Sequence, residues 1–128
     1  MDGKVLLVRD RGRRRYSLPG GGIHRGEPSI SAAARELYEE VGLSADKIER
    51  VTTYQSRTRQ HTVFLITQFH GRLRLKSEID GMLWWDGKAE VPMFRHVSEI
   101  VRQVEGETWP ANQEQRLAFS AVLLAASN

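Results

Sequence analysis

An α+β sandwich, in which helices flank a central block of strands, is the fold class that this 128-residue sequence predicts. Three observations predict it. Short segments rich in β-branched and aromatic residues fill the middle of the chain, segments of helical periodicity flank them, and glycine, proline or capping residues separate the two kinds. The length suits one compact domain and no repeat or linker is visible, so we expect residues 1–128 to form a single domain.

The strand segments are identified by composition and by the turns between them. An apolar run between charged residues near the start is typical of a buried strand, and two longer segments are rich in β-branched and aromatic residues. Glycines follow Pro19 and allow a turn that approaches a ligand closely, while His70-Gly71 predicts a turn into an alternating segment. The expected strands are residues 5–8, 16–18, 48–54, 61–69, 72–75 and 82–85.

Three helices are expected. The first spans residues 30–41, with Ser29 as its N-cap and Gly42 at its end. Ser98 is a candidate cap for a short second helix. Asn112 with Gln115 resembles a capping pair, which predicts a last helix that reaches Ala126.

Composition excludes several classes of protein. The chain has no cysteine, which excludes a disulfide scaffold, thiolate metal sites and cysteine nucleophiles. The first residues do not resemble a signal peptide, and no apolar run is long enough to cross a bilayer. We therefore expect a soluble cytoplasmic protein without a membrane partner.

Positive charge is concentrated at the start of the chain. Residues 1–25 contain seven Lys or Arg against two Asp, and most of the arginines flank the glycine turn at residues 20–22. Such an arrangement would attract an anionic ligand, although a solvated basic loop has the same composition. No aromatic-basic nucleic-acid motif accompanies it, so nucleic acid is not expected as the main partner.

Three carboxylates share one stripe of the first predicted helix, beside its apolar face. Glu36, Glu39 and Glu40 lie within about one quarter of the helix circumference at 100° per residue. Glu36 and Glu40 repel each other at this spacing unless a cation compensates them. Oxygen ligands suit Mg²⁺, with Mn²⁺ as a possible substitute. A solvated helix surface would show the same spacing, so the spacing alone does not decide.

The wider segment from Gly21 to Leu43 fits a longer pattern, G-x5-E-x7-R-E-U-x-E-E-x-G-U, in which U is a bulky aliphatic residue. Every fixed position is met, at Gly21, Glu27, Arg35, Glu36, Leu37, Glu39, Glu40, Gly42 and Leu43. Nine positions over 23 residues are far more specific than a lone glycine-rich loop. This segment resembles the signature of the Nudix (MutT-like) hydrolase family.

The resemblance implies a Nudix-type α/β/α sandwich around a mixed sheet and a Mg²⁺-dependent pyrophosphohydrolase. Such an enzyme cleaves a nucleoside di- or triphosphate derivative by attack of water on phosphorus, giving a nucleotide and the phosphorylated remainder. Position by position, Glu36, Glu39 and Glu40 resemble metal ligands, with the Gly20 carbonyl as a further one. Glu36 or Glu39 would also orient or deprotonate the water. Arg35 and Glu27 would hold these carboxylates in place.

The remaining site residues are assigned by position along the chain. Glu78 precedes residues 82–85 where some relatives present an extra ligand carboxylate, and Arg9 and Arg25 lie where a phosphate could be contacted. Tyr16 is a candidate for stacking on a base. The alternatives are solvent-exposed positions for the charged residues and a partly buried strand position for Tyr16. The histidines show no metal-ligand spacing and are assigned no role: His24, His61, His70 and His96.

Two departures from the family leave questions open. The family normally has a strand before the one at residues 5–8, so the first strand is expected to be missing or shortened. An uncovered strand edge would then favour a homodimer. No substrate-specific residue pattern is visible, so the small-molecule nucleotide substrate stays open, and a non-catalytic Nudix-fold nucleotide-binding module is the alternative function.

Overall fold

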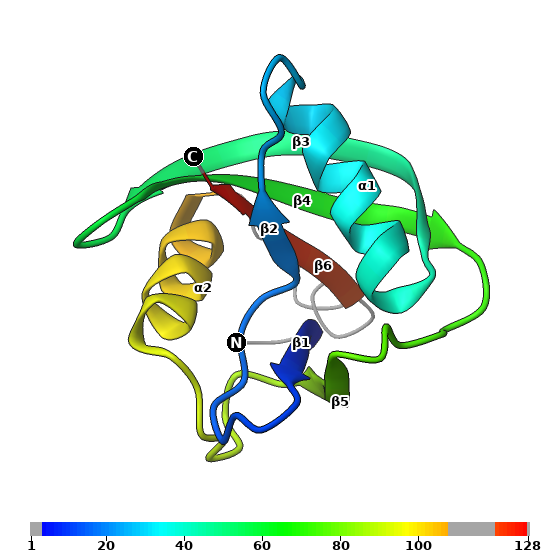
Figure 1. The fold of residues 1–128 in the computed structure, drawn as a ribbon. Helices are drawn as coiled ribbons and strands as arrows, with labels where there is room; N and C mark the ends of the chain where they lie inside the picture. The colour runs from blue at the N-terminus through cyan, green and yellow to red at the C-terminus, as the bar shows by residue number, and fades with distance from the viewer. Residues whose placement is uncertain (1–3, 108–119, 128) are drawn as a thin grey trace.

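The computed structural model describes residues 4–107 and 120–127 and confirms the α+β sandwich (Figure 1). The helices α1 and α2 pack on opposite faces of a mixed six-stranded sheet. Neither helix in this part of the chain is long and apolar enough to cross a membrane. In chain order the elements are β1 (Lys4–Asp10), β2 (Gly20–Gly22), α1 (Ser29–Val41), β3 (Ser44–Gln55), β4 (Gln60–His70), β5 (Ile79–Trp85), α2 (Arg95–Glu107) and β6 (Ser120–Ser127).

The two faces of the sheet explain why the first strand is apolar throughout. Val5 and Leu7 of β1 face α2, whereas Leu6 and Val8 face α1. All four side chains are almost completely buried. Because successive side chains of a strand alternate between faces, a strand covered on both faces is a continuous apolar run rather than an alternating one. The predicted strand at residues 5–8 is therefore confirmed, with β1 extending slightly further at both ends.

The predicted last helix is wrong in its described part, because residues 120–127 form the strand β6. This strand lies between β4 and β1 in the sheet order β3-β4-β6-β1-β5. Its side chains at Val122, Leu124 and Ala126 are fully buried, which is a period of two. Alanine and leucine favour helices, but burial between two strands outweighs that weak propensity. Asn112 and Gln115, the predicted caps, lie outside the described residues.

The same strand removes the reason for expecting a homodimer. β1 pairs antiparallel with β5 from Val5 onward and parallel with β6 at Lys4 and Val5. Val8 also forms a bridge with Ser17, in the predicted extended segment 16–18. The strand edge that was expected to be bare beside β1 is thus covered by this chain itself.

The predicted helix boundaries are partly wrong. Helix α1 begins at Ser29 with Pro28 at the N-cap position and no side-chain cap, so Ser29 is not the cap. Its predicted end is confirmed, since Gly42 adopts φ 80° and its N–H donates to the Tyr38 carbonyl. Helix α2 begins at Arg95, three residues before the predicted cap Ser98, whose hydroxyl donates to the Arg95 carbonyl.

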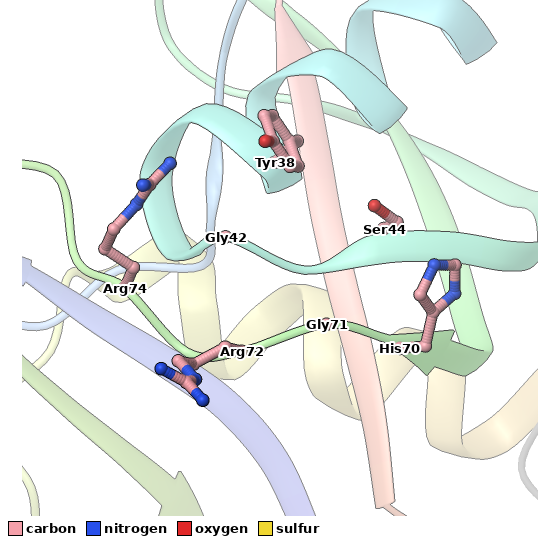
Figure 2. Close-up of a pocket in the computed structure, with 7 residues that line it drawn as sticks. All are labelled: Tyr38, Gly42, Ser44, His70, Gly71, Arg72 and Arg74. Carbon is pink, nitrogen blue, oxygen red and sulfur yellow. The ribbon is translucent and has the colours of Figure 1, made fainter.

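The predicted strand at residues 72–75 is also wrong. This segment has no regular structure and is bound to the end of α1, where the Arg74 and Lys76 N–H groups donate to the Val41 and Glu40 carbonyls. It passes so close that a Cβ on Gly42 would lie 2.6 Å from the Arg72 carbonyl oxygen. The carbonyls at a helix end lack partners within the helix, and here they take the N–H groups that a strand would use. Figure 2 shows the open cavity of about 350 Å³ at this crossing.

The strand assignment of β6 predicts a large cost for truncating one leucine. Leu124→Ala should lower the free energy of unfolding by about 2–5 kcal/mol, because its side chain is fully buried in the sheet. Leu73→Ala is the matched control, since Leu73 is 45% exposed, and should change stability by less than about 0.5 kcal/mol. Urea unfolding of both variants checks this. Equal stabilities for the two variants would contradict the central position of β6.

Candidate active site

The glycine strand β2 forms one side of the candidate site. Ala125 N–H donates to the Pro19 carbonyl and Ile23 N–H donates to the Ser127 carbonyl, which joins β2 to β6. Because backbone groups alternate along a strand, those of Gly20 and Gly22 face the opposite edge. Gly20 has φ 156°, and a Cβ there would lie 2.1 Å from the Ala125 carbonyl oxygen, so no other residue fits.

The carboxylate-bearing half of α1 packs directly against this edge. A Cβ on Gly21 would lie 2.6 Å from the Glu36 carboxylate, so the absence of a side chain lets Glu36 approach the backbone. The Gly20 N–H donates to both carboxylate oxygens of Glu40, at 3.3 and 3.4 Å. Helix and strand therefore meet through carboxylate-to-backbone contacts rather than through apolar side chains.

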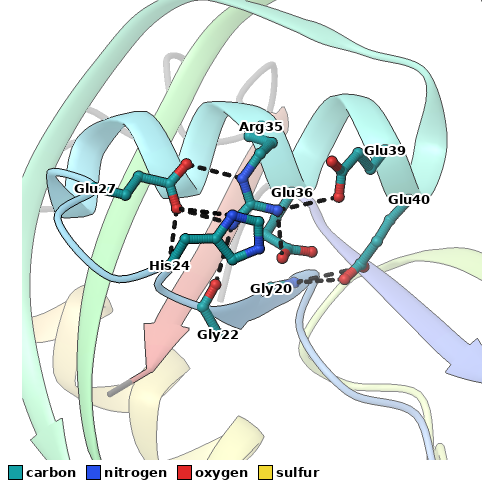
Figure 3. Close-up of polar contacts among 8 residues, drawn as sticks. All are labelled: Gly20, Gly22, His24, Glu27, Arg35, Glu36, Glu39 and Glu40. Atoms are coloured by element: carbon teal, nitrogen blue, oxygen red, sulfur yellow. Dashed lines mark hydrogen bonds and ion pairs between the residues drawn. The ribbon is translucent and has the colours of Figure 1, made fainter.

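Arg35 lies at the centre of a network that fixes the carboxylates (Figure 3). Its Nε and one Nη hold Glu27 at 2.8 and 2.9 Å, and its other Nη contacts Glu36 at 3.0 Å and Glu39 at 3.1 Å. The Gly22 carbonyl accepts a further bond at 3.1 Å. The guanidinium holds the pKa of Glu27 at about 2, and Glu27 raises the pKa of Arg35 in return. Both groups therefore stay charged across the physiological pH range.

Glu40 is buried, unlike a glutamate on a solvated helix surface. The residue is 8% exposed. Burial raises the pKa of Glu40 to about 8, and the negative charges of Glu36 and Asp10 act in the same direction, while the Gly20 N–H opposes them. A carboxylate that is buried next to other carboxylates with one backbone donor is short of positive charge.

This shortage bears on whether the residues fit a divalent metal. In the described part of the chain no three His, Asp or Glu side chains converge as a ready metal cluster. Glu36 and Glu39 are turned toward Arg35, and Glu39 is the more exposed of the two. The donor set is nevertheless all oxygen, and the uncompensated Glu40 beside Glu36 and Gly20 is what a hard divalent cation would neutralise. The residues fit Mg²⁺ or Mn²⁺ chemically.

Arg9 and Tyr16, which were predicted to bind substrate, contact each other instead of standing free. The Arg9 guanidinium lies 5.2 Å from the centre of the Tyr16 ring, and its Nε donates to Asp80 at 3.1 Å. Gly81 leaves room for this stack, because a Cβ there would lie 3.1 Å from both side chains. The Nε edge of the Arg9 guanidinium is thus held by Asp80. Its Nη groups make no hydrogen bond or ion pair with the described residues.

The structure does not bring Arg25 and Glu78 into the carboxylate cluster. Arg25 is exposed in the loop that carries Glu27. Glu78 is exposed as well, and its own backbone N–H, together with the Ser77 hydroxyl that donates to its carboxylate, lowers the pKa of Glu78. Its roles as a metal ligand or base, and the phosphate contact of Arg25, stay predictions.

Sequence reasoning missed two features near the site. Asp10 shares a face of β1 with Leu6 and Val8 and raises the pKa of Glu40. Because residues 5–8 are all apolar, the sequence alone does not indicate which side chains of this strand face α1. His61 and His96 were assigned no role, yet their rings lie 5.8 Å apart. Their separation along the chain gives no signal of this contact.

The comparisons with known proteins agree with the motif. The family model of the NUDIX domain matches residues 1–113. The chain belongs to the Nudix family. A similar solved structure is a MutT from Aliivibrio salmonicida or Vibrio cholerae, with a TM-score of 0.70 and 19% identity over 81% of this chain and 86% of that chain. A putative Nudix hydrolase family member from Chromobacterium violaceum has a TM-score of 0.69 and 24% identity over 91% of this chain and 83% of that chain. These two likenesses support the Nudix fold.

Curated relatives of this Nudix chain match over a shorter stretch. An RNA pyrophosphohydrolase of Sodalis glossinidius is 50% identical over 44 residues, which is 34% of this chain and 25% of that protein. An RNA pyrophosphohydrolase of Shewanella loihica is 39% identical over 54 residues, or 42% of this chain and 31% of that protein. The matched part thus spans less than a third of the length of these relatives.

The raised pKa of Glu40 predicts how stability depends on pH without added metal. The folded wild type favours the protonated form of the Glu40 carboxyl. The resulting contribution to the free energy of unfolding is complete below about pH 4.5 and is lost as the pH rises to about 8. Relative to Glu40→Gln, which cannot ionise, the wild type should lose roughly 3–5 kcal/mol of unfolding free energy over this range. Urea unfolding in EDTA at several pH values measures the difference.

Glu49→Gln is the matched control for that titration. Glu49 is exposed on β3, so its substitution should leave the pH dependence of the wild type unchanged. A constant difference between wild type and Glu40→Gln from pH 4.5 to 8 would contradict the raised pKa.

Proposed function

We propose that this Nudix protein is a divalent-metal-dependent pyrophosphohydrolase, with Mg²⁺ as the ion, acting on a nucleoside di- or triphosphate derivative. The observation that carries the proposal is the buried Glu40 carboxylate beside Glu36 at the free edge of β2. Glutamates on a helix surface would be solvated, whereas Glu40 is buried with too little positive charge around it, and a divalent ion would supply that charge.

In the proposed reaction, water attacks a phosphorus of the diphosphate bridge. A new P–O bond forms to the water oxygen, the bridging P–O bond breaks, and the bridging oxygen leaves with the second phosphate. A bound Mg²⁺ would neutralise phosphate charge and acidify a bound water. Glu36, Glu40 and the Gly20 carbonyl would hold the ion, and Glu39 would complete the set by turning from Arg35. Glu36 or Glu39 would accept the proton of the attacking water.

The hydrogen-bond network around Arg35 supports the roles proposed for the carboxylates. Its guanidinium shares its donors among Glu27, Glu36, Glu39 and the Gly22 carbonyl, so Glu36 is held beside the β2 backbone without a ligand, whereas Glu39 would leave Arg35 to bind the ion. Glu27 is ionised at all relevant pH values and keeps Arg35 in place. Orientation by such surrounding contacts strengthens metal binding by limiting the positions a ligand side chain can take.

Two further candidates belong in the same test. The relatives named RNA pyrophosphohydrolase suggest an RNA that carries a pyrophosphate bond as an alternative substrate. A nucleotide-binding module that does not hydrolyse its ligand is the alternative class. The test is a panel of nucleoside diphosphate derivatives, nucleoside triphosphates and a 5′-triphosphorylated oligoribonucleotide, each with Mg²⁺ or with EDTA, analysed by chromatography of the products. Binding without turnover across the panel would favour the module.

Glu39→Gln and Glu40→Gln should each lower kcat/KM at least about a hundredfold on the active substrate, because each removes a charged oxygen from the proposed ion site. Glu49→Gln, an exposed carboxylate on β3, is the control and should retain wild-type activity. Initial rates at saturating and limiting Mg²⁺ measure the effect. Wild-type rates in Glu40→Gln would remove this residue from the ion site.

Arg9 is proposed to contact a phosphate through its Nη groups, and Arg25 is the second candidate for such a contact. A charge-assisted contact of this kind predicts that Arg9→Ala raises KM about tenfold or more. Asp80→Asn removes the negative charge beside the Arg9 Nε but keeps an oxygen acceptor and the guanidinium, so it should raise KM much less. Arg13→Ala is the exposed control. Steady-state kinetics at two ionic strengths distinguish a direct contact with phosphate from long-range attraction of the anionic substrate. Equal increases of KM in Arg9→Ala and Arg13→Ala would indicate long-range attraction alone.

A further inference from the structure

A second cavity lies at the start of α2, on the face of the sheet opposite α1. Its volume is about 440 Å³, and its lining includes three rings, of Tyr54, Phe94 and His96, three guanidinium groups, of Arg15, Arg57 and Arg95, and the Glu99 carboxylate. Arg15 and Phe94 also line an adjoining cavity of about 300 Å³ with Arg13 and Arg14. Aromatic rings and guanidinium groups thus meet around one open space.

The rings form a nearly parallel row. His96 lies 5.8 Å from Phe94 at an interplanar angle of 21°, and 5.8 Å from His61 at 5°. The Arg15 guanidinium lies 5.8 Å from the centre of the Phe94 ring. Nearly parallel rings with a guanidinium beside them offer a flat, polarisable surface, which suits stacking of another flat ring.

The charges around this row favour an anionic aromatic ligand. Burial lowers the pKa of both His61 and His96, so the histidine rings are mainly neutral near pH 7. In the described part of the chain, Arg15 and Arg57 have no carboxylate partner, whereas the neighbouring Arg95 is paired with Glu99. The cavity therefore combines a neutral stacking surface with two free positive charges.

A short path connects this cavity to the carboxylate network. The Gly22 carbonyl accepts a bond from Arg35, Gly22 pairs with Ser127 of β6, and the Ser127 hydroxyl lies 2.6 Å from His61 Nδ1. Gly22 and His61 are thus two strand positions apart, or about 10 Å. A ligand that binds at both the carboxylates and the ring row would have to extend over at least this distance.

We propose that this cavity binds the base of the nucleotide substrate, with the base stacked against Phe94 and His96 beside the Arg15 guanidinium. The inference rests on the proposed function for the phosphate end of the ligand, but base binding itself does not require turnover. The proposal assigns recognition of the base to α2 and the loop at Arg15, and not to Tyr16, which does not line this cavity.

The test measures, by NMR titration, the binding of adenosine 5′-monophosphate and of ribose 5-phosphate to the whole chain without metal. Phe94→Leu should raise the Kd of the nucleotide at least about fivefold, because stacking of a base on one aromatic ring contributes at least this factor. The Kd of ribose 5-phosphate should not change. Phe69→Leu is the matched control, since Phe69 stacks on Trp84 in the core cluster that packs against α1, and it should leave both constants unchanged.

A second variant keeps the test independent of Phe94 packing. Arg15 is exposed, so Arg15→Gln should fold normally and should raise the Kd of the nucleotide several-fold, whereas Arg50→Gln on β3 should not. Undetectable nucleotide binding by the wild type, or equal Kd values for wild type, Phe94→Leu and Arg15→Gln, would overturn the proposal. Binding that depends on Phe94 without hydrolysis of any panel compound would support this site while rejecting the proposed enzyme.

Discussion

The Glu40 carboxylate lies buried against the Gly20 backbone, beside Glu36 and within the field of Asp10, and the structure around it is arranged to tolerate that charge. Burying a carboxylate next to others is unfavourable unless the charge is removed or compensated. In the protein alone, compensation comes from the Gly20 N–H group, from the positive charge of Lys76 and from proton uptake near neutral pH. A bound divalent cation would compensate the same negative charge, so the unfavourable burial of Glu40 would favour ion binding.

The glycines of β2 make that burial geometrically possible. A side chain at Gly20 would collide with Ala125, and one at Gly21 would displace Glu36. Strand β6 then holds the other edge of β2, and Arg35 ties the Gly22 carbonyl to the helix. The site thus depends on close approach of two backbones, and the charged network of Arg35 and Glu27 provides the rigidity that apolar side chains provide elsewhere in the core.

Local patterns predicted most of the fold and the helical part of the site, and failed where long-range contacts decide. The spacing of the glutamates and the end of α1 at Gly42 are properties of neighbouring residues, so the sequence alone predicted them. The segments at 72–75 and 120–127 were misassigned because their environment is set by α1 in one case and by β4 and β1 in the other. The burial of Glu40 escaped prediction for the same reason, since it depends on the contact of α1 with Gly20 of β2.

The position of β6 links the two halves of the site. Ser127 pairs with Gly22 on one side and with His61 on the other, so the strand that completes the sheet also sets the distance between the carboxylates and the ring row. Helix α1 presents charge at the free edge of β2, whereas α2 presents rings on the opposite face. A ligand with a phosphate end and a flat aromatic end matches both surfaces. Because the two proposed roles fall to different helices, phosphate chemistry and base recognition would be able to vary independently on this fold.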